Sequence, residues 1–508
     1  MAFAVGDLGW AQPAMRKQAP ARRILGALAA MLLLSGCVGV DVVSEQADNS
    51  AFKPSATPVT VDSVQRGNRL ANLARSQHGR ILQTYGGEYS DPKLELMVAK
   101  IVGNLTTVGG NSNQAYRITI LNSPQVNAFA LPGGYLYVTR GLLALANDSA
   151  EVSAVIAHEM GHVTANHGIA RQQLEQEAKA AEVAAETLFP SSPELQQAAL
   201  RGKLRSAQFS RNQELEADAI GIRTVGQAGY DPFAASHFLA AMAAYGKLRS
   251  VSGATDESLD FLASHPNVPQ RIMLAQGHAR QFGPEGTGVR DRDAFLAGID
   301  GLLFGDSPEE GYVRNNTFLH PKLGLSFSVP EGFVIDNSAT AVTANGPGDT
   351  AVRFDGVELK AGQSLADYVT SGWVTGLDPA SVRPVTINGN EAVVAKAAAD
   401  NWLFDVTVIR AGNQAFRLLT AAPASSSGLD AVAASVRNSF RMLSASERAA
   451  LKPLRIRIVT ARAGDTISSM ASRMVGVGRK EELFRVLNEL QPGQALSPGY
   501  KVKIVTDQ

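Results

Sequence analysis

The chain has 508 residues, of which 45% are hydrophobic, and its 47 lysine and arginine residues balance 47 aspartate and glutamate residues. This neutral total excludes a global charge that would favour nucleic acid or an anionic membrane surface. The length exceeds what one hydrophobic core usually supports, so we expect roughly three domains. After residue 40, no apolar run reaches the ~18 uncharged residues that a membrane-spanning helix needs.

Residues 1–36 are predicted to be a secretory signal. A basic stretch precedes an apolar run over 24–34, which is too short to span a bilayer. The following "LSGC" resembles the lipoprotein signal-peptidase box, and this resemblance implies that Cys37 is lipidated. Cys37 is the only cysteine, which excludes disulfides within the chain and thiolate chemistry. The alternative is an ordinary cleaved signal with an incidental cysteine, and translation starts at Met1 or at Met15.

Residues 37–143 are predicted to contain a tether, two helices and two strands. Residues 37–62 show no clear period and are predicted to be a tether. Helical periodicity resumes over about 63–85, and a second helix is predicted over 92–108. Residues 116–143, "YRITILNSPQVNAFALPGGYLYVTRGLL", predict two strands joined by a Pro-Gly-Gly turn.

The sequence "HEMGH" then places two histidines four residues apart on a predicted helix. Because a helix has 3.6 residues per turn, His158 and His162 share one face and could bind one ion. Glu159 lies beside them and could hold an attacking water and move its proton, the role of the general base in zinc hydrolases. The alternative is an amphipathic helix that carries solvated histidines.

A catalytic zinc site needs a third protein ligand and one open position. The downstream segment "ELEAD" lies on a second predicted helix that ends near Gly229. On this helix Glu214 could bind the metal, and Asp218, one turn further, could accept the free N–H of a ligating imidazole. A solvated acidic face is the alternative, and Glu216 is assigned to such a face.

Together "HEMGH", "ELEAD" and "NAFALPGGYLYVTRGLL" resemble the zinc metallopeptidase family that contains the prenyl-protein (CAAX-type) proteases and the bacterial periplasmic assembly-surveillance proteases. The resemblance covers roughly residues 63–280. It implies one Zn²⁺ per chain, held by His158, His162 and Glu214, with Glu159 as the catalytic base. The prenyl-protease branch is built from membrane spans, which this sequence lacks, so prenylated substrates are not expected.

The same resemblance implies a mainly α-helical, zincin-type peptidase domain with a small β-sheet, and we place this domain at residues 63–300. In the family, the strand beside the zinc helix is an exposed edge that accepts an extended substrate as an added strand. The alternating "GYLYVTR", residues 134–140, precedes the zinc helix. An internal hairpin strand is the alternative for it.

The segment "SHPNVPQRI" is similar to the His-Pro-x-x-x-x-Arg segment of the soluble periplasmic members. This similarity implies that His265 lies near the zinc, where it stabilises the oxyanion or fills the open position at rest. It also implies that Arg271 helps to hold the substrate or the loop. The alternative is a loop histidine at the start of a helix. His167 lies beyond the zinc pair and is expected at the surface or in support of a ligand, rather than as a ligand.

Glycine, proline and charge cluster at 283–288 and 304–312, which predicts domain boundaries there. Residues 313–445 predict short strands with two helices, and therefore a small α+β domain. It contains no catalytic constellation, and selection of substrates, binding of a partner and a spacer role all remain open. His320 is isolated there and is predicted to be a surface histidine.

Residues 455–505 resemble a LysM domain, the small βααβ module that binds N-acetylglucosamine polymers. The matching pieces are "AGDTISSMA", "LFRVLNEL" and "LSPGYKVKIV". The link "RMVGVGRKEE" is long for such a module, which leaves glycan binding open. The resemblance implies peptidoglycan as the polymer within reach of a periplasmic lipoprotein.

The predicted fold is therefore multidomain, and the predicted function is a zinc metalloendopeptidase of the bacterial envelope that cleaves unfolded or misassembled proteins. We expect it in the periplasm, lipid-anchored to the outer rather than the inner membrane. The alternative is an inactive peptidase-fold scaffold or chaperone-like protein that binds the cell wall, and a peptidoglycan hydrolase is a third possibility. Glu159 beside both histidines, together with a separate acidic ligand, favours the enzyme.

Overall fold

The computed structural model describes residues 77–508 except 110–114, 132, 172, 175, 177, 178, 180–192, 252–260, 262–264, 266–268, 340, 412, 413 and 492. The predicted signal over 1–36, the lipidation site Cys37 and the tether over 37–62 lie outside these residues. Within the described part, no helix combines the length and the apolar character that crossing a membrane requires.

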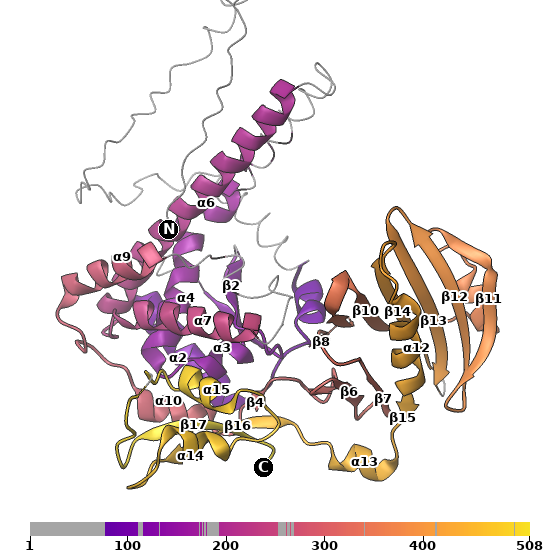
Figure 1. The fold of residues 1–508 in the computed structure, drawn as a ribbon. Helices are drawn as coiled ribbons and strands as arrows, with labels where there is room; N and C mark the ends of the chain where they lie inside the picture. Colours follow the sequence, from indigo (N-terminus) through magenta and orange to yellow (C-terminus); the bar gives the residue numbers. More distant parts are fainter. Residues whose placement is uncertain are drawn as a thin grey trace, which may run out of the picture. The chain divides into compact units, whose positions relative to one another are not determined.

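The first part of the described chain is helical with one small sheet (Figure 1). Its helices are α2 (Pro92–Val108), α3 (Arg140–Leu145), α4 (Ser149–Thr164), α6 (Pro193–Gln227), α7 (Ala234–Val251), α9 (Pro269–Ala279), the 3₁₀ turn η1 (Arg280–Phe282) and α10 (Arg292–Ile299). Helix α2 confirms the predicted helix over 92–108. Helix α6 ends two residues before Gly229, whose positive φ of 82° suits the end of a helix.

Helix α4 is the central helix of this part. Asp148 caps it by accepting a hydrogen bond from the backbone N–H of Glu151, and every residue from Ser149 to Gly161 is buried. A helix that is buried on all sides needs close neighbours. Two glycines, one on α4 and one on α6, allow these two helices to approach each other closely. A Cβ on Gly221 of α6 would lie 2.9 Å from the backbone nitrogen of His158, and one on Gly161 of α4 would lie 3.1 Å from the backbone carbonyl oxygen of Ala217. Glycines at both positions therefore let α4 and α6 pack closely.

The small sheet has the order β1-β3-β2, from β1 (Arg117–Leu121), β2 (Ala128–Leu131) and β3 (Tyr135–Thr139). The predicted hairpin is present as β2 and β3, but β1 pairs with β3 in parallel and makes a third strand. The strand within "GYLYVTR" is therefore internal, with all five residues buried. The edge strand that contacts α4 is β2 (Figure 1).

Residues 312–442 contain two antiparallel sheets, with strand orders β11-β12-β13-β14-β10-β9-β8 and β15-β7-β6-β5. The strands are β5 (Tyr312–Arg314), β6 (Thr317–His320), β7 (Leu325–Ser328), β8 (Val334–Asn337), β9 (Val342–Asn345), β10 (Ala351–Val357), β11 (Leu377–Ile387), β12 (Asn390–Ala399), β13 (Trp402–Ala411), β14 (Gln414–Pro423) and β15 (Arg441–Met442). The helices here and just after are η2 (Pro347–Asp349), α11 (Leu365–Val369), α12 (Leu429–Ser439) and α13 (Ala445–Ala450). Strands and helices occur together here, as the sequence predicts.

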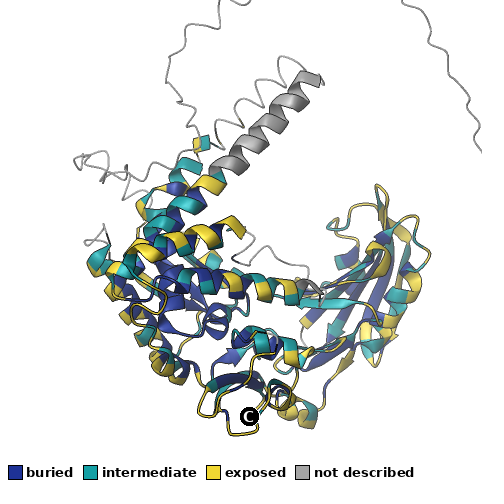
Figure 2. Cartoon of the chain, turned by 60° about the vertical axis from the view of Figure 1, so that its left-hand side comes forward, coloured by how far each residue is buried: buried dark blue, intermediate teal, exposed yellow. Residues whose placement is uncertain are grey.

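Aromatic side chains fill the core of this part, among them Phe318, Phe327 and Phe354. His320 was expected at the surface, and this expectation is wrong. Its side chain is buried, and Nδ1 accepts a hydrogen bond of 3.2 Å from the backbone N–H of Leu323. Figure 2 shows the buried residues gathered along the large sheet and inside the helical part.

The C-terminal residues form β16 (Leu454–Thr460), α14 (Ile467–Ser472), α15 (Lys480–Leu487) and β17 (Lys501–Thr506). Strands β16 and β17 are antiparallel, and β4 (Leu303–Phe304) pairs with β16 as a third strand. Side chains of this segment join the hydrophobic core of the helical part. Within that core, the fully buried Lys503 donates hydrogen bonds of 2.8–3.0 Å to the carbonyls of Ala144, Leu145 and Ala146. The segment is thus packed firmly against the end of α3.

Candidate metal centre

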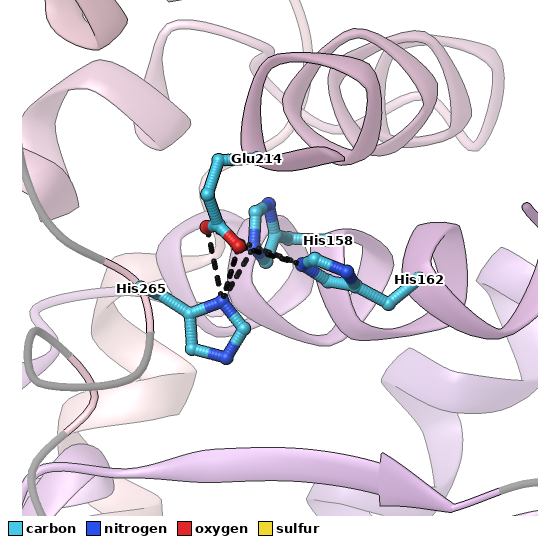
Figure 3. Close-up of side chains that lie close together, drawn as sticks. All are labelled: His158, His162, Glu214 and His265. Carbon is cyan, nitrogen blue, oxygen red and sulfur yellow. Dashed lines mark hydrogen bonds and ion pairs between the residues drawn. The ribbon is translucent and has the colours of Figure 1, made fainter. Parts of the chain in front are cut away.

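The two histidines of "HEMGH" face one point from consecutive turns of α4. The Nε2 atoms of His158 and His162 lie 3.0 Å apart, and the rings meet at a steep angle (Figure 3). His158 is buried, while His162 is partly exposed. The helical spacing therefore directs one ring nitrogen of each residue to the same place, as the sequence predicts for a pair that could bind an ion.

Glu214 reaches the same point from α6. Its Oε2 lies 3.4 Å from His158 Nε2, and its Oε1 lies 3.4 Å from His162 Nε2. Burial by itself would raise the pKa of Glu214, but its bonds to His158 and His265 outweigh burial and hold the pKa far below the usual value. The carboxylate is therefore charged, as a metal ligand must be.

His265 completes the cluster. Its Nδ1 lies 3.0 Å from Glu214 Oε2 and 3.4 Å from His158 Nε2, and its ring stacks on Phe261 at a centroid distance of 4.4 Å. One ligand atom each from His158, His162, Glu214 and His265 lies within 4.8 Å of the others. Three imidazoles and one carboxylate are donors that suit zinc. The residues thus fit a metal ion.

Glu159 lies beside this cluster. Its Oε1 is 3.7 Å from His265 Nε2, and it is a buried oxygen with no hydrogen-bond partner among the described residues. Burial raises the pKa of Glu159 above its usual value, against the opposing charges of His265 and His158. A buried carboxyl group with a free oxygen costs stability unless something binds to it, so this oxygen is available to accept a proton.

Asp218 and Arg271 contact the residues of the cluster and connect them to one another. Asp218 Oδ1 lies 2.9 Å from His158 Nδ1. Arg271 donates two hydrogen bonds to the Asp218 carboxylate, of 2.7 and 2.8 Å, and one of 3.2 Å to the backbone carbonyl of His265. The Nη1 nitrogen that donates to His265 also lies 3.2 Å from Glu214 Oε2. All three guanidinium nitrogens of the buried Arg271 therefore contact groups of the protein itself. The sequence had left open whether Arg271 holds the substrate or the segment around His265.

Burial would raise the pKa of the Asp218 carboxyl, but its bonds to Arg271 and His158 outweigh burial and lower it. In the same way burial would lower the pKa of His158, and its bonds to Asp218 and Glu214 raise it to about 9. A metal ion must therefore displace a tightly held proton from this imidazole.

For His167 the sequence left two places open, the surface or the support of a ligand, and the structure favours the second. His167 is buried, and its Nδ1 lies 2.9 Å from His162 Nδ1. A spacing of five residues does not align two side chains on a continuous helix, so periodicity gave no signal for this contact. The signal that could have found it is Asn166, a residue type that often ends a helix in the left-handed conformation.

The sequence model of Peptidase family M48 matches residues 91–279, which include every residue of the cluster. Metalloprotease LoiP of Escherichia coli (strain K12) is 30% identical over 218 residues, which cover 42% of this chain and 81% of LoiP. The chain belongs to peptidase family M48. Peptidases of the M48 family use zinc, and the four-residue cluster could hold one such ion.

Other M48 relatives are longer than the region they share with this chain. A beta-barrel assembly-enhancing protease of Yersinia pestis is 30% identical over 207 residues, which cover 39% of this chain and 41% of that protein. The mitochondrial metalloendopeptidase OMA1 of Arabidopsis thaliana is 34% identical over 200 residues, covering 37% of this chain and 36% of OMA1. The chain thus spans about half the length, or less, of several curated M48 relatives.

Proposed function

We propose that this M48 protein is a zinc-dependent endopeptidase of the bacterial envelope that cleaves unfolded or misassembled proteins. The observation that carries the proposal is the free Glu159 oxygen beside four converging metal-binding side chains. The names of the relatives support it, since they include a metalloprotease, a metalloendopeptidase and a protease that enhances the assembly of β-barrels.

In this proposal His158, His162 and Glu214 hold one Zn²⁺. When bound, zinc supplies Lewis acidity, which makes water more acidic and polarises a peptide carbonyl. Glu159 accepts the proton of the attacking water and passes it to the leaving amine. Its raised pKa suits both halves of that transfer, because a group that titrates nearer to neutral pH both takes and returns a proton.

Asp218, Arg271 and His265 support this chemistry. Asp218 orients the imidazole of His158, and Arg271 fixes Asp218, Glu214 and the backbone of His265 in one network. His265, whose Nδ1 is 3.0 Å from Glu214, fills the fourth ligand position at rest and shields the site. When a substrate displaces the His265 imidazole, the same side chain donates to the oxyanion.

The substrate binds as an extended strand along β2. This edge strand lies next to α4, and a backbone hydrogen bond from Ala130 of β2 reaches Glu159. A peptide added at this edge would gain main-chain hydrogen bonds without a demand on its sequence. Such binding suits unfolded proteins of varied sequence.

The proposal also assigns the remaining segments of the chain. The proposal assigns residues 1–36 to a signal peptide, Cys37 to a lipid anchor, 37–62 to a tether and 63–300 to the peptidase domain. Residues 313–445 form a small α+β domain, and residues 455–505 a LysM-like module that holds the protein near peptidoglycan. The order β16-α14-α15-β17 supports the LysM assignment. The resulting location is the periplasm, at the outer membrane.

The proposal is tested by the zinc content of the purified chain and by its cleavage of casein. We expect about one zinc per chain, loss of cleavage with a chelator and recovery with added zinc. His158→Ala should lose both zinc and cleavage, because the buried ligand set is broken. A wild-type chain that binds zinc but cleaves neither casein nor an unfolded envelope protein would favour the inactive scaffold instead.

A further inference from the structure

The second histidine of "HEMGH" has a partner on its far side. Its Nε2 faces the cluster, 3.0 Å from His158 Nε2 and 3.4 Å from Glu214 Oε1. Its other nitrogen, Nδ1, lies 2.9 Å from Nδ1 of the buried His167. The rings meet edge to face at a centroid distance of 4.9 Å. His162 is therefore held from both of its ring nitrogens.

A break in the helix brings His167 into this position. In a continuous helix, residue i+5 would point about 140° away from residue i. Helix α4 instead ends at Thr164, and Asn166 adopts a left-handed conformation with a φ of 56°. The side-chain amide of Gln213 then donates a hydrogen bond of 3.1 Å to the His167 carbonyl, which fixes the new direction of the chain. The contact with His162 is thus built by the local fold.

The other ring nitrogen of His167 meets a carboxylate. Nε2 lies 3.2 Å from Oε2 of Glu216, whose side chain is 43% exposed. One arrangement of protons satisfies the whole chain of contacts. His162 donates from Nδ1 to His167 Nδ1, and His167 donates from Nε2 to Glu216. This arrangement leaves His162 Nε2 without a proton, as a metal ligand requires.

The three acidic residues of "ELEAD" therefore have three different positions. Glu214 enters the cluster, Asp218 lies 2.9 Å from His158 Nδ1, and Glu216 reaches His162 through His167. We propose that His167 is a positioning residue that, together with Glu216, fixes the tautomer and orientation of His162. This inference rests on the proposed metal site and assigns Glu216 a role in place of the solvated face that the sequence suggested.

The test measures the zinc dissociation constant of the full chain by competition with a chelator. Outer partners of metal-binding histidines typically change metal affinity by about 10- to 100-fold, so we expect a loss in this range for His167→Asn. Glu216→Gln, which acts one residue further away, should weaken zinc binding about 3- to 10-fold. Glu216→Asp should restore part of the loss. Because the Glu216 side chain is half-exposed, both Glu216 variants should have the melting temperature of the wild type when zinc is absent.

A matched control is available at His237, whose Nε2 lies 2.9 Å from Glu285 on the protein surface. Glu285→Gln removes the same kind of carboxylate–histidine pair away from the cluster and should leave zinc affinity unchanged. If His167→Asn does not fold, Glu216→Gln decides. An unchanged zinc affinity in Glu216→Gln, or an equal loss in Glu285→Gln, would overturn the inference alone. A wild-type chain without zinc would overturn the proposed function as well.

Discussion

Glu159 differs in its partners from Glu214 and Asp218, the other two carboxylates described at the centre. Glu214 and Asp218 both touch Arg271, whereas Glu159 is buried with a free oxygen and a raised pKa. At the scale of single residues, this difference supports the proposal that Glu159 moves a proton while Glu214 binds the metal and Asp218 orients a ligand.

The first prediction follows from that difference. Glu159→Gln keeps the size of the side chain but cannot accept a proton, so cleavage of casein should fall by about 10²- to 10⁴-fold. Zinc content should stay at the wild-type level, because the ligand set is intact. Initial rates and metal analysis of the same preparation measure both. Cleavage at a wild-type rate by this variant would exclude Glu159 as the base.

The second prediction concerns His265. If its imidazole shields the site at rest, His265→Ala should raise basal cleavage of a flexible substrate several-fold, because water then reaches the cluster without displacing an imidazole. Steady-state rates on casein, at equal zinc content, measure this effect. A lower kcat with zinc retained would show instead that support of the oxyanion is its main role.

The third prediction concerns His320, far along the chain in β6. Burial lowers the pKa of this histidine from 6.5 to about 4, so the unfolded chain binds its proton at a higher pH than the folded protein. Stability is therefore present above pH 6.5 and is lost as the pH falls towards 4. At ~1.4 kcal/mol per pKa unit, the loss near pH 4 is on the order of 3 kcal/mol.

His320→Asn retains an acceptor for the backbone N–H of Leu323 but does not titrate in this range. We expect a smaller drop in melting temperature between about pH 7.5 and pH 4.5 than in the wild type. Equal drops in the two proteins would show that other groups control the acid sensitivity.

At the scale of elements, the centre depends on the close contact between α4 and α6. Spacing within "HEMGH" and "ELEAD" was enough to predict which side chains share a helix face. It could not predict the distance between the helices, which depends on Gly161 and Gly221 and on the burial of α4 on all sides. Nor could it decide between an edge and an internal place for β3, or predict that β1 pairs with β3 in parallel, because the alternation within a strand does not identify its pairing partners.

The fourth prediction tests this contact. In Gly221→Ala the new methyl group would lie 2.9 Å from the backbone nitrogen of His158, so the helices must move apart. We expect weaker zinc binding and a loss of about 1 to 3 kcal/mol of stability, as for other overpacked cores. Gly168→Ala is the control, since a methyl group there meets nothing within 4 Å. Zinc affinity and thermal melting of both variants give the comparison, and identical behaviour would contradict the packing argument.

At the scale of the whole molecule, the C-terminal segment is part of the peptidase core. The sequence predicted its order of strands and helices but treated it as a separate module. Its apolar side chains join the core of α2 and α10, and Lys503 caps the end of α3, just before α4, the helix that carries "HEMGH". Such long-range contacts leave no local pattern in the sequence, which explains why they were not predicted.

The fifth prediction compares two lysines of β17. Lys503 is fully buried on three carbonyls, and burial lowers its pKa to about 7. Lys503→Ala removes a donor from three buried carbonyls, of which Leu145 keeps a hydrogen bond from the Asn147 side chain, and should cost on the order of 2 to 4 kcal/mol. Lys501 is 38% exposed and pairs with Asp293, so Lys501→Ala should cost no more than about 1 kcal/mol. Denaturant unfolding measures both, and similar losses would contradict the assigned role of Lys503.

The pairing of β4 with β16 has a consequence for the evolution of the chain. Phe304 and Leu454 are opposite each other in an antiparallel ladder, where such partners lie about 5 Å apart. The two ends of the segment between them, residues 305–453, are therefore close together in space. This is the arrangement of a domain that is inserted into a β-hairpin. A short turn could take its place without stretching either strand. The region could therefore have been acquired, exchanged or lost among relatives while the metal centre and the C-terminal strands stayed together.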